Sequence, residues 1–237
     1  MAPGKKYKTT LQYAFRSSLP VMAGYLVLGA GFGILMESKG YSVWWSVLMS
    51  VTIYAGSMQY VAVSLLSGGA TLLAAALMTI VVNIRHLFYG ITMLRHYKDT
   101  GAWKPYLIFS LTDETYSLVC SAEVPEGMSR RHYYLFLSML NQSYWIIGSF
   151  AGGLIGSLIP FQTAGIEFSM TALFTVIFVN QWEKNRQHLP ALSGIVITLS
   201  CLLIFGRNSF LIPSMLLITL ALWFEKRWIK EDFQNEF

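Results

Sequence analysis

Apolar residues occur along this chain in long runs separated by short polar stretches, and eight such runs can be delimited. They cover residues 17–36, 43–66, 70–93, 104–122, 133–159, 163–181, 189–205 and 208–224. A helix of about 20 apolar residues can cross the roughly 30 Å hydrocarbon core of a bilayer. The pattern therefore predicts an all-α integral membrane protein, a polytopic helical bundle that forms one domain over residues 1–237, with short tails at 1–15 and 225–237.

The composition agrees with a membrane protein and excludes several other classes. Hydrophobic residues make up 54% of the chain and charged residues 12%, whereas soluble domains carry about 25% charge. The basic residues flank apolar runs without an aromatic–basic repeat, so we expect no nucleic-acid partner. The sequence has no phosphate-binding loop, no GxSxG, no CxxC pair and no HExxH, so we expect neither an enzyme nor a cofactor or metal site.

The distribution of lysine and arginine indicates an orientation. Eight spans place both termini on one side, and most basic residues lie there. The other side holds Lys39, Arg95, Lys98, Lys104 and Arg207. Because the side richer in Lys and Arg is normally cytoplasmic, we expect both termini in the cytoplasm. The basic loop 94–104 does not fit, and it would move inside if segment two or three did not cross fully, which gives seven spans as the alternative.

Glycines recur at four-residue intervals in two of the segments. Gly29 and Gly33 form one such pattern, and Gly148, Gly152 and Gly156 form another. This spacing allows helix backbones to approach closely in lipid. The glycine-rich helices also make segments one–two resemble segments five–six, which indicates an internal repeat of the kind found in transporters.

The stretch YAGSMQY at residues 54–60 places polar residues inside the second apolar run. Gly56 can interrupt a helix, and Ser57 and Gln59 could then satisfy freed backbone groups or bind a substrate. The alternative is an ordinary polar contact between helices. We expect Tyr54 and Tyr60 to line the cavity if one exists.

The stretch NIRHLFYG at residues 83–90 contains an arginine within the third run. Arg85 and Tyr89 are four residues apart and share a helix face, with Asn83 on a neighbouring one. A buried Arg85 would face a cavity and need an anionic partner. Alternatively, the helix ends early and Arg85 extends to the membrane surface.

The stretch SLTDETYS at residues 110–117 could supply that partner through Asp113 and Glu114. The spacing of Ser110 and Asp113 resembles a capping box, which favours a helix start at the surface. The alternative is a discontinuous helix whose acids face a central site. Adjacent carboxylates repel each other in a low dielectric, so one of them would then hold a proton and couple transport to it. Further candidates for the cavity wall are Tyr116, Asn141 and Gln142.

These three stretches, in this order after a glycine-rich first helix, resemble the AzlC-type branched-chain amino acid permeases. The motifs are AGSMQY at 55–60, NIR at 83–85 with Tyr89, and TDETY at 112–116, and the likeness covers roughly residues 15–225. The resemblance implies export of valine, leucine, isoleucine or methionine across the bacterial inner membrane. It also implies a partner, a small membrane subunit of the AzlD type.

The sequence thus predicts a proton-coupled antiporter of amino acids in a lipid bilayer. The predicted substrate-binding residues are Gly56, Ser57, Gln59, Asn83, Arg85 and Tyr89, and the predicted proton-coupling residues are Asp113 and Glu114. Two alternatives remain open. The same polar groups could line a channel, or the chain could be a membrane assembly subunit that transports nothing.

Overall fold

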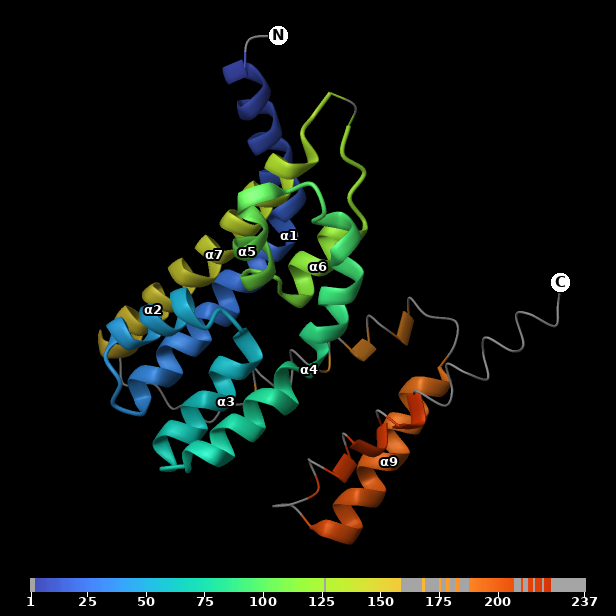
Figure 1. Ribbon diagram of the computed structural model, residues 1–237. Helices are drawn as coiled ribbons and strands as arrows, with labels where there is room; N and C mark the ends of the chain where they lie inside the picture. Colours follow the sequence, from blue (N-terminus) through green and yellow to red (C-terminus); the bar gives the residue numbers. More distant parts are fainter. Residues whose placement is uncertain are drawn as a thin grey trace, which may run out of the picture. The chain divides into compact units, whose positions relative to one another are not determined.

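The computed structural model describes residues 3–125, 127–158 and 188–206, together with scattered positions between 168 and 222. Within this described part, every regular element is a helix (Figure 1). The chain divides into two compact units, Met1–Thr171 and Ala172–Phe237. Most of the predicted segment 163–181 lies outside the described residues. The second unit contributes α9, Leu189–Phe205, which coincides with the seventh predicted segment.

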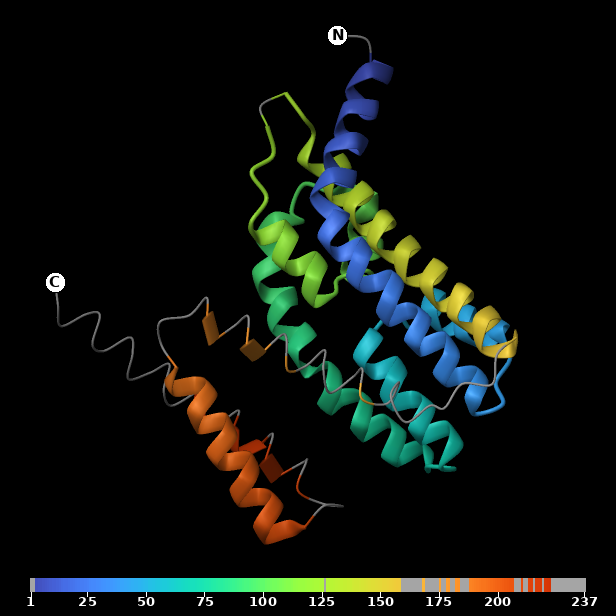
Figure 2. The same cartoon turned by 180° about the vertical axis from the view of Figure 1, so that it is seen from behind.

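Two long helices, α1 (Pro3–Ser38) and α7 (Arg130–Leu158), lie side by side and form the frame of the first unit (Figures 1 and 2). Their backbones touch at glycines. A Cβ on Gly29 would lie 2.9 Å from the Trp145 carbonyl oxygen, and a Cβ on Gly152 would lie 2.5 Å from Ala30 Cα. The close contact predicted from the glycine spacing is confirmed. Residues 3–15, predicted as a tail, belong to α1.

The second predicted segment consists of two short helices, α2 (Val43–Thr52) and α3 (Gly56–Ser67). The predicted interruption at Gly56 is confirmed. At the break, Tyr54 has φ 44°, a left-handed conformation that is uncommon for a bulky residue.

The contacts of α2 and α3 with α7 show that the chain reverses at this break. At the start of α2, Val43 packs against Gly153, and at its end the Gln142 amide donates to the Val51 carbonyl oxygen. The chain then returns, because Gly56 packs against Trp145 and the amide of Gln59 contacts Ser50. The segment is therefore a helical hairpin, which we call hairpin 1, with its tip at residues 53–55.

The fourth predicted segment is a second hairpin of α5 (Lys104–Phe109) and α6 (Asp113–Cys120), preceded by the 3₁₀ turn η1 (Gly101–Trp103). It starts at the other end of α7, where Gly101 faces Arg131. Tyr106 then contacts Gln142, Thr115 contacts Asn141, and Val119 packs in a core with Leu137. We call this element hairpin 2, and its tip is residues 110–112.

The predicted capping arrangement at the start of this helix is wrong in detail. Thr112, not Ser110, is the N-cap of α6, and its Oγ1 accepts from the Thr115 amide. The Ser110 hydroxyl instead donates to the Tyr106 carbonyl oxygen at the end of α5. The break between α5 and α6 thus has a side-chain hydrogen bond on each side, from Ser110 at the end of α5 and to Thr112 at the start of α6. A helix that simply starts at the membrane surface needs only the second of these.

Helix α4 (Leu72–His96) connects the two hairpins and bends by 44° between His86 and Tyr89. Within the described residues, one helix, Tyr7–Ser38, is long and apolar enough to cross a membrane by itself. The bent pair of α4 passes the same test if its halves count as one span.

Candidate functional site

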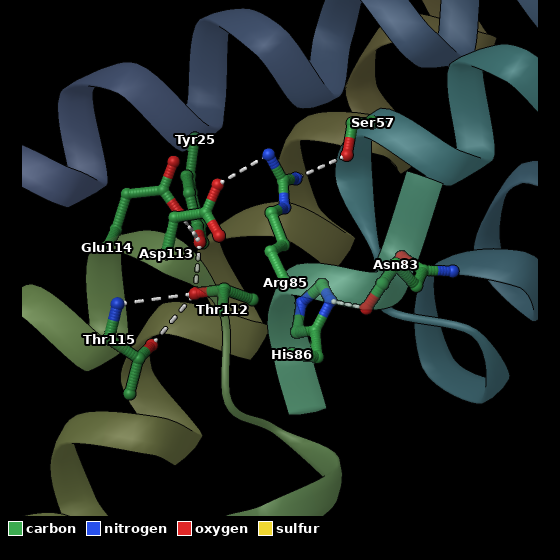
Figure 3. A network of polar contacts seen from close by, with 9 residues as sticks. All are labelled: Tyr25, Ser57, Asn83, Arg85, His86, Thr112, Asp113, Glu114 and Thr115. Atoms are coloured by element: carbon green, nitrogen blue, oxygen red, sulfur yellow. Dashed lines mark hydrogen bonds and ion pairs between the residues drawn. The ribbon is translucent and has the colours of Figure 1, made fainter. Parts of the chain in front are cut away.

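The tips of the two hairpins meet beside α4, where Arg85 connects them (Figure 3). Arg85 Nη2 donates to Ser57 Oγ at 2.6 Å, in the first turn of α3. Arg85 Nη1 lies 3.1 Å from Asp113 Oδ2, in the first turn of α6. Side-chain exposures of 30% and 20% leave this pair within reach of a small ligand. The predicted pairing of Arg85 with an acid is present.

Both returning helices direct their N-termini toward this pair. The unpaired N–H groups of a helix N-terminus carry a partial positive charge. Asp113 and Glu114 lie in the first turn of α6, where negative side chains complement that charge. The site therefore holds one full cation, two carboxyl groups and two partial positive charges in one polar region.

A chain of hydroxyl groups extends from Glu114 toward α7. The Tyr25 hydroxyl lies 2.6 Å from Glu114 Oε2 and 2.7 Å from Thr112 Oγ1. Thr112 Oγ1 lies 3.0 Å from Thr115 Oγ1, which accepts from Asn141 Nδ2 at 2.9 Å. This chain contacts α1, α6 and α7, so it connects the frame to the acids.

Gln59 takes part in a separate and fully buried polar cluster. Trp145 Nε1 donates to Gln59 Oε1 at 2.9 Å, and Gln59 Nε2 donates to Ser50 Oγ at 3.2 Å. Ser50 in turn donates to Ser149 at 2.8 Å. In this conformation the Gln59 amide holds hairpin 1 to α7 and does not face Arg85.

Three further predicted residues, Asn83, Tyr89 and Tyr60, make contacts outside the charged pair. Asn83 points away from it in Figure 3, and its buried side-chain oxygen has no hydrogen-bond partner in the described part of the chain. Tyr89 stacks on Tyr116 of α6 with ring centroids 4.4 Å apart, so Arg85 and Tyr89 both contact α6, as their shared face requires. Tyr60 donates to the Leu28 carbonyl oxygen at 2.7 Å.

The tip tyrosine and the second amide of α7 complete the surroundings. The buried Tyr54 hydroxyl lies near Tyr25 and Thr112. Gln142 accepts from Tyr106 at 2.8 Å, so it connects hairpin 2 to the frame. Gly56 leaves room for the Trp145 ring, since a Cβ there would lie 2.9 Å from it.

The sequence did not identify four residues that shape this region: Tyr25, Thr112, Thr115 and Trp145. A threonine directly before two acids is a recognisable N-cap pattern, so Thr112 could have been found. Tyr25 and Trp145 lie in long apolar helices, and their partners are distant in sequence, so no local pattern marks them.

A cavity of about 390 Å³ lies between α4 and hairpin 2. His86, next to Arg85 in the chain, and Leu111, next to Thr112, are part of its wall. Its other lining residues include Met93, Leu94 and Ile108. The cavity is largely apolar, Lys104 also lines it, and neither Arg85 nor Asp113 is among its described lining residues.

Discontinuous helices whose tips surround a partly buried charged pair are typical of helical membrane transport proteins. The family model described as "AzlC protein" matches residues 20–159, and the chain belongs to this family. It is 44% identical over 205 residues to the "Branched-chain amino acid transport protein AzlC" of Bacillus subtilis, covering 86% of this chain and 81% of that protein.

Other relatives are named as membrane proteins. An "Uncharacterized membrane protein" of Helicobacter pylori is 41% identical, covering 88% of this chain and 92% of the relative. The "Inner membrane protein YgaZ" of Escherichia coli is 28% identical, covering 86% and 85%. No solved structure matches this chain. The chain is thus an all-helical membrane protein.

Proposed function

We propose that this protein is the large subunit of a secondary transporter that exports branched-chain and other large neutral amino acids, coupled to protons. The observation that carries the proposal is the Arg85–Asp113 pair between the hairpin tips. An amino acid carries one positive and one negative group, so it can separate such a pair and satisfy both charges. The guanidinium group binds carboxylates through two parallel hydrogen bonds, and Asp113 would take the ammonium group.

In the proposal, the cavity between α4 and hairpin 2, whose wall includes His86 beside Arg85 in the chain, takes the aliphatic side chain. Its volume of about 390 Å³ is within the roughly 300–1,000 Å³ of typical ligand sites. Burying a branched side chain against apolar walls stabilises binding by about 1.5–3 kcal/mol. This combination favours valine, leucine, isoleucine and methionine over polar amino acids.

The hairpins also support a revised membrane topology. α2 and α3 have 10 and 12 residues, or about 15 and 18 Å at 1.5 Å per residue, half of the hydrocarbon core. In the proposal, hairpins 1 and 2 enter from opposite faces and meet near the middle. Six of the eight apolar segments then cross, and both termini stay cytoplasmic.

This topology removes the charge anomaly of the loop 94–104. With hairpin 1 inserted from outside, α4 carries that loop to the cytoplasm, and only Lys39 and Arg207 remain outside. The positive-inside rule is then better satisfied than with eight spans. Single cysteines at Lys39 and Asp99, both exposed, in a chain lacking Cys120 and Cys201 test this. A membrane-impermeant maleimide added to intact cells should label position 39 and not position 99. Labelling of both positions is the result that eight spans predict, and it contradicts six spans, as does labelling of position 99 alone.

The transport proposal is tested with labelled valine in inverted membrane vesicles. Vesicles that contain the wild-type chain together with the small subunit should accumulate valine when a proton gradient is imposed, which a channel cannot do. In Arg85→Lys, the lysine has no planar group that can reach Ser57 and Asp113 together. The apparent affinity of the transporter for valine should therefore fall about tenfold, which corresponds to the loss of a bidentate contact of ~1.4 kcal/mol or more. Equal affinity for wild type and Arg85→Lys would refute this binding mode.

The small AzlD-type subunit is part of the proposal, supported by the family resemblance. We expect the chain alone to be folded but to transport poorly, because lipid does not satisfy polar groups and helix packing depends on close contact. Vesicles with the chain alone and with both subunits measure the difference. Equal valine export in the two preparations would remove the need for a partner.

A further inference from the structure

The two adjacent acids of hairpin 2 have different surroundings, and the difference separates their roles. Asp113 faces Arg85 of α4 at 3.1 Å, so the guanidinium group neutralises its charge. Within the described residues, the side-chain partners of Glu114 are neutral hydroxyl groups, those of Tyr25 on α1 and of Thr112 at the N-cap of α6. An uncompensated carboxylate in a low dielectric is costly, so Glu114 gains more than Asp113 from taking up a proton.

From this arrangement we infer that Glu114 carries the transported proton and that Tyr25 and Thr112 are positioning residues that adjust their hydrogen bonds to its charge. This inference rests on the proposed function and goes beyond it by assigning the proton to one acid. An O–H bond forms at the Glu114 carboxyl group when a proton enters from one side, and the same bond breaks when the proton leaves to the other. No other co-reactant is needed.

The hydroxyl chain can serve both charge states of Glu114. When the carboxylate is ionised, Tyr25 donates to Oε2 over 2.6 Å, and Thr112 donates to Thr115 over 3.0 Å. When Glu114 is protonated, it donates to Tyr25, Tyr25 donates to Thr112, and Thr112 donates to Thr115 over 3.0 Å. Each hydroxyl group has one donor and two acceptor positions, so both directions satisfy the chain without moving any heavy atom.

The other groups around Glu114 leave this assignment intact. Tyr54 faces it from the tip of hairpin 1, Asp113 precedes it on α6, and α7 contributes the neutral amide of Asn141 through Thr115. Arg85 of α4 acts through its ion pair with Asp113.

The assignment can be measured without transport. Infrared spectra of the purified full-length chain, recorded across a pH series, report the carbonyl band of a protonated carboxylic acid in an apolar environment. We expect this band in the wild type and in Asp113→Asn, and its loss in Glu114→Gln. A band that persists in Glu114→Gln and disappears in Asp113→Asn, or no such band at any pH, overturns the inference.

Tyrosine variants test the positioning role even if Glu114→Gln does not fold. Tyr25→Phe removes the donor to the ionised carboxylate, so the midpoint of the band should move up by about one pH unit. Tyr144→Phe is the matched control, because this tyrosine lies at the same α1–α7 interface and its hydroxyl contacts Ser18 Oγ at 3.1 Å. Midpoints that coincide for Tyr25→Phe and Tyr144→Phe would exclude a role for Tyr25.

Vesicle transport separates this inference from the proposed function. Glu114→Gln should lose gradient-driven valine accumulation by at least tenfold, while valine–valine exchange, which needs no net proton movement, remains measurable. Full gradient-driven accumulation in Glu114→Gln contradicts the inference and leaves the proposed function standing. Wild-type vesicles that neither accumulate nor exchange valine contradict the proposed function, and the infrared result still decides which acid holds the proton.

Discussion

Replacing Gly152 with alanine tests whether the contact between α1 and α7 determines the stability of the frame. The added Cβ would lie 2.5 Å from Ala30 Cα and 2.6 Å from the Ala30 carbonyl carbon. Carbon atoms prefer a separation of about 3.5–4.0 Å, so the helices must move apart by about 1 Å. Because the opposing atoms belong to the backbone, no side-chain rotation can relieve the clash.

The cost follows from the same geometry. Overpacking a close contact destabilises by about 1–3 kcal/mol, and a gap of 0.5–1 Å also removes a quarter to a half of the attraction between the neighbouring atoms. The control is Gly24→Ala on α1, where a Cβ would meet nothing within 4 Å. Both variants gain the same helix propensity of alanine over glycine, so their difference isolates the clash.

The assay is the apparent melting temperature of the purified chain in detergent, followed by tryptophan fluorescence. For a chain of this size, about 2–4 °C is expected for each kcal/mol. Gly152→Ala should therefore melt several degrees below Gly24→Ala. If the two variants melt together, the α1–α7 contact can adapt and the glycines are not required for close packing.

Two further substitutions address the tips and their supports. Trp145→Phe leaves the buried Gln59 Oε1 without its donor, so stability should fall by about 1–3 kcal/mol in the same melting assay, whereas Trp44→Phe, at a position 69% exposed, should change little. Thr112→Val keeps the shape but removes the N-cap of α6, which should cost about 0.5–2 kcal/mol. Thr79→Val, on an exposed face of α4, is its control, and equal melting of the two threonine variants would show that the cap is dispensable.

The breaks in the helices could be predicted from the sequence, but the reversal of the chain could not. Gly56 within an apolar run indicates an interruption, and α3 begins there. However, the two halves of hairpin 1 are as apolar as the two halves of one spanning helix, so hydropathy cannot distinguish a continuing chain from a returning one. Only the order of contacts along α7, from Val43 to Gly56, shows the direction.

The candidate site was likewise predictable only in part from the sequence. A shared helix face correctly placed Arg85 and Tyr89 toward one neighbour, since periodicity determines faces. Periodicity did not show that the Gln59 amide binds Trp145 and Ser50. Ser57 and Gln59 are both polar residues in the first turn of α3, and the sequence alone does not tell which of them faces Arg85. Tyr25 was not recognised since its partner Glu114 lies 89 positions away, and such pairing depends on the whole fold.

The pairing of α1 with α7 also determines the order in which the protein can be assembled during synthesis. α1 is complete at Ser38, but α7 does not begin until Arg130. At 5–20 residues per second, the ribosome needs roughly 5–20 s to translate the sequence between them. Both hairpins therefore leave the ribosome before the helix that supports their tips exists. During this interval the glycine face of α1 has no α7 to pack against.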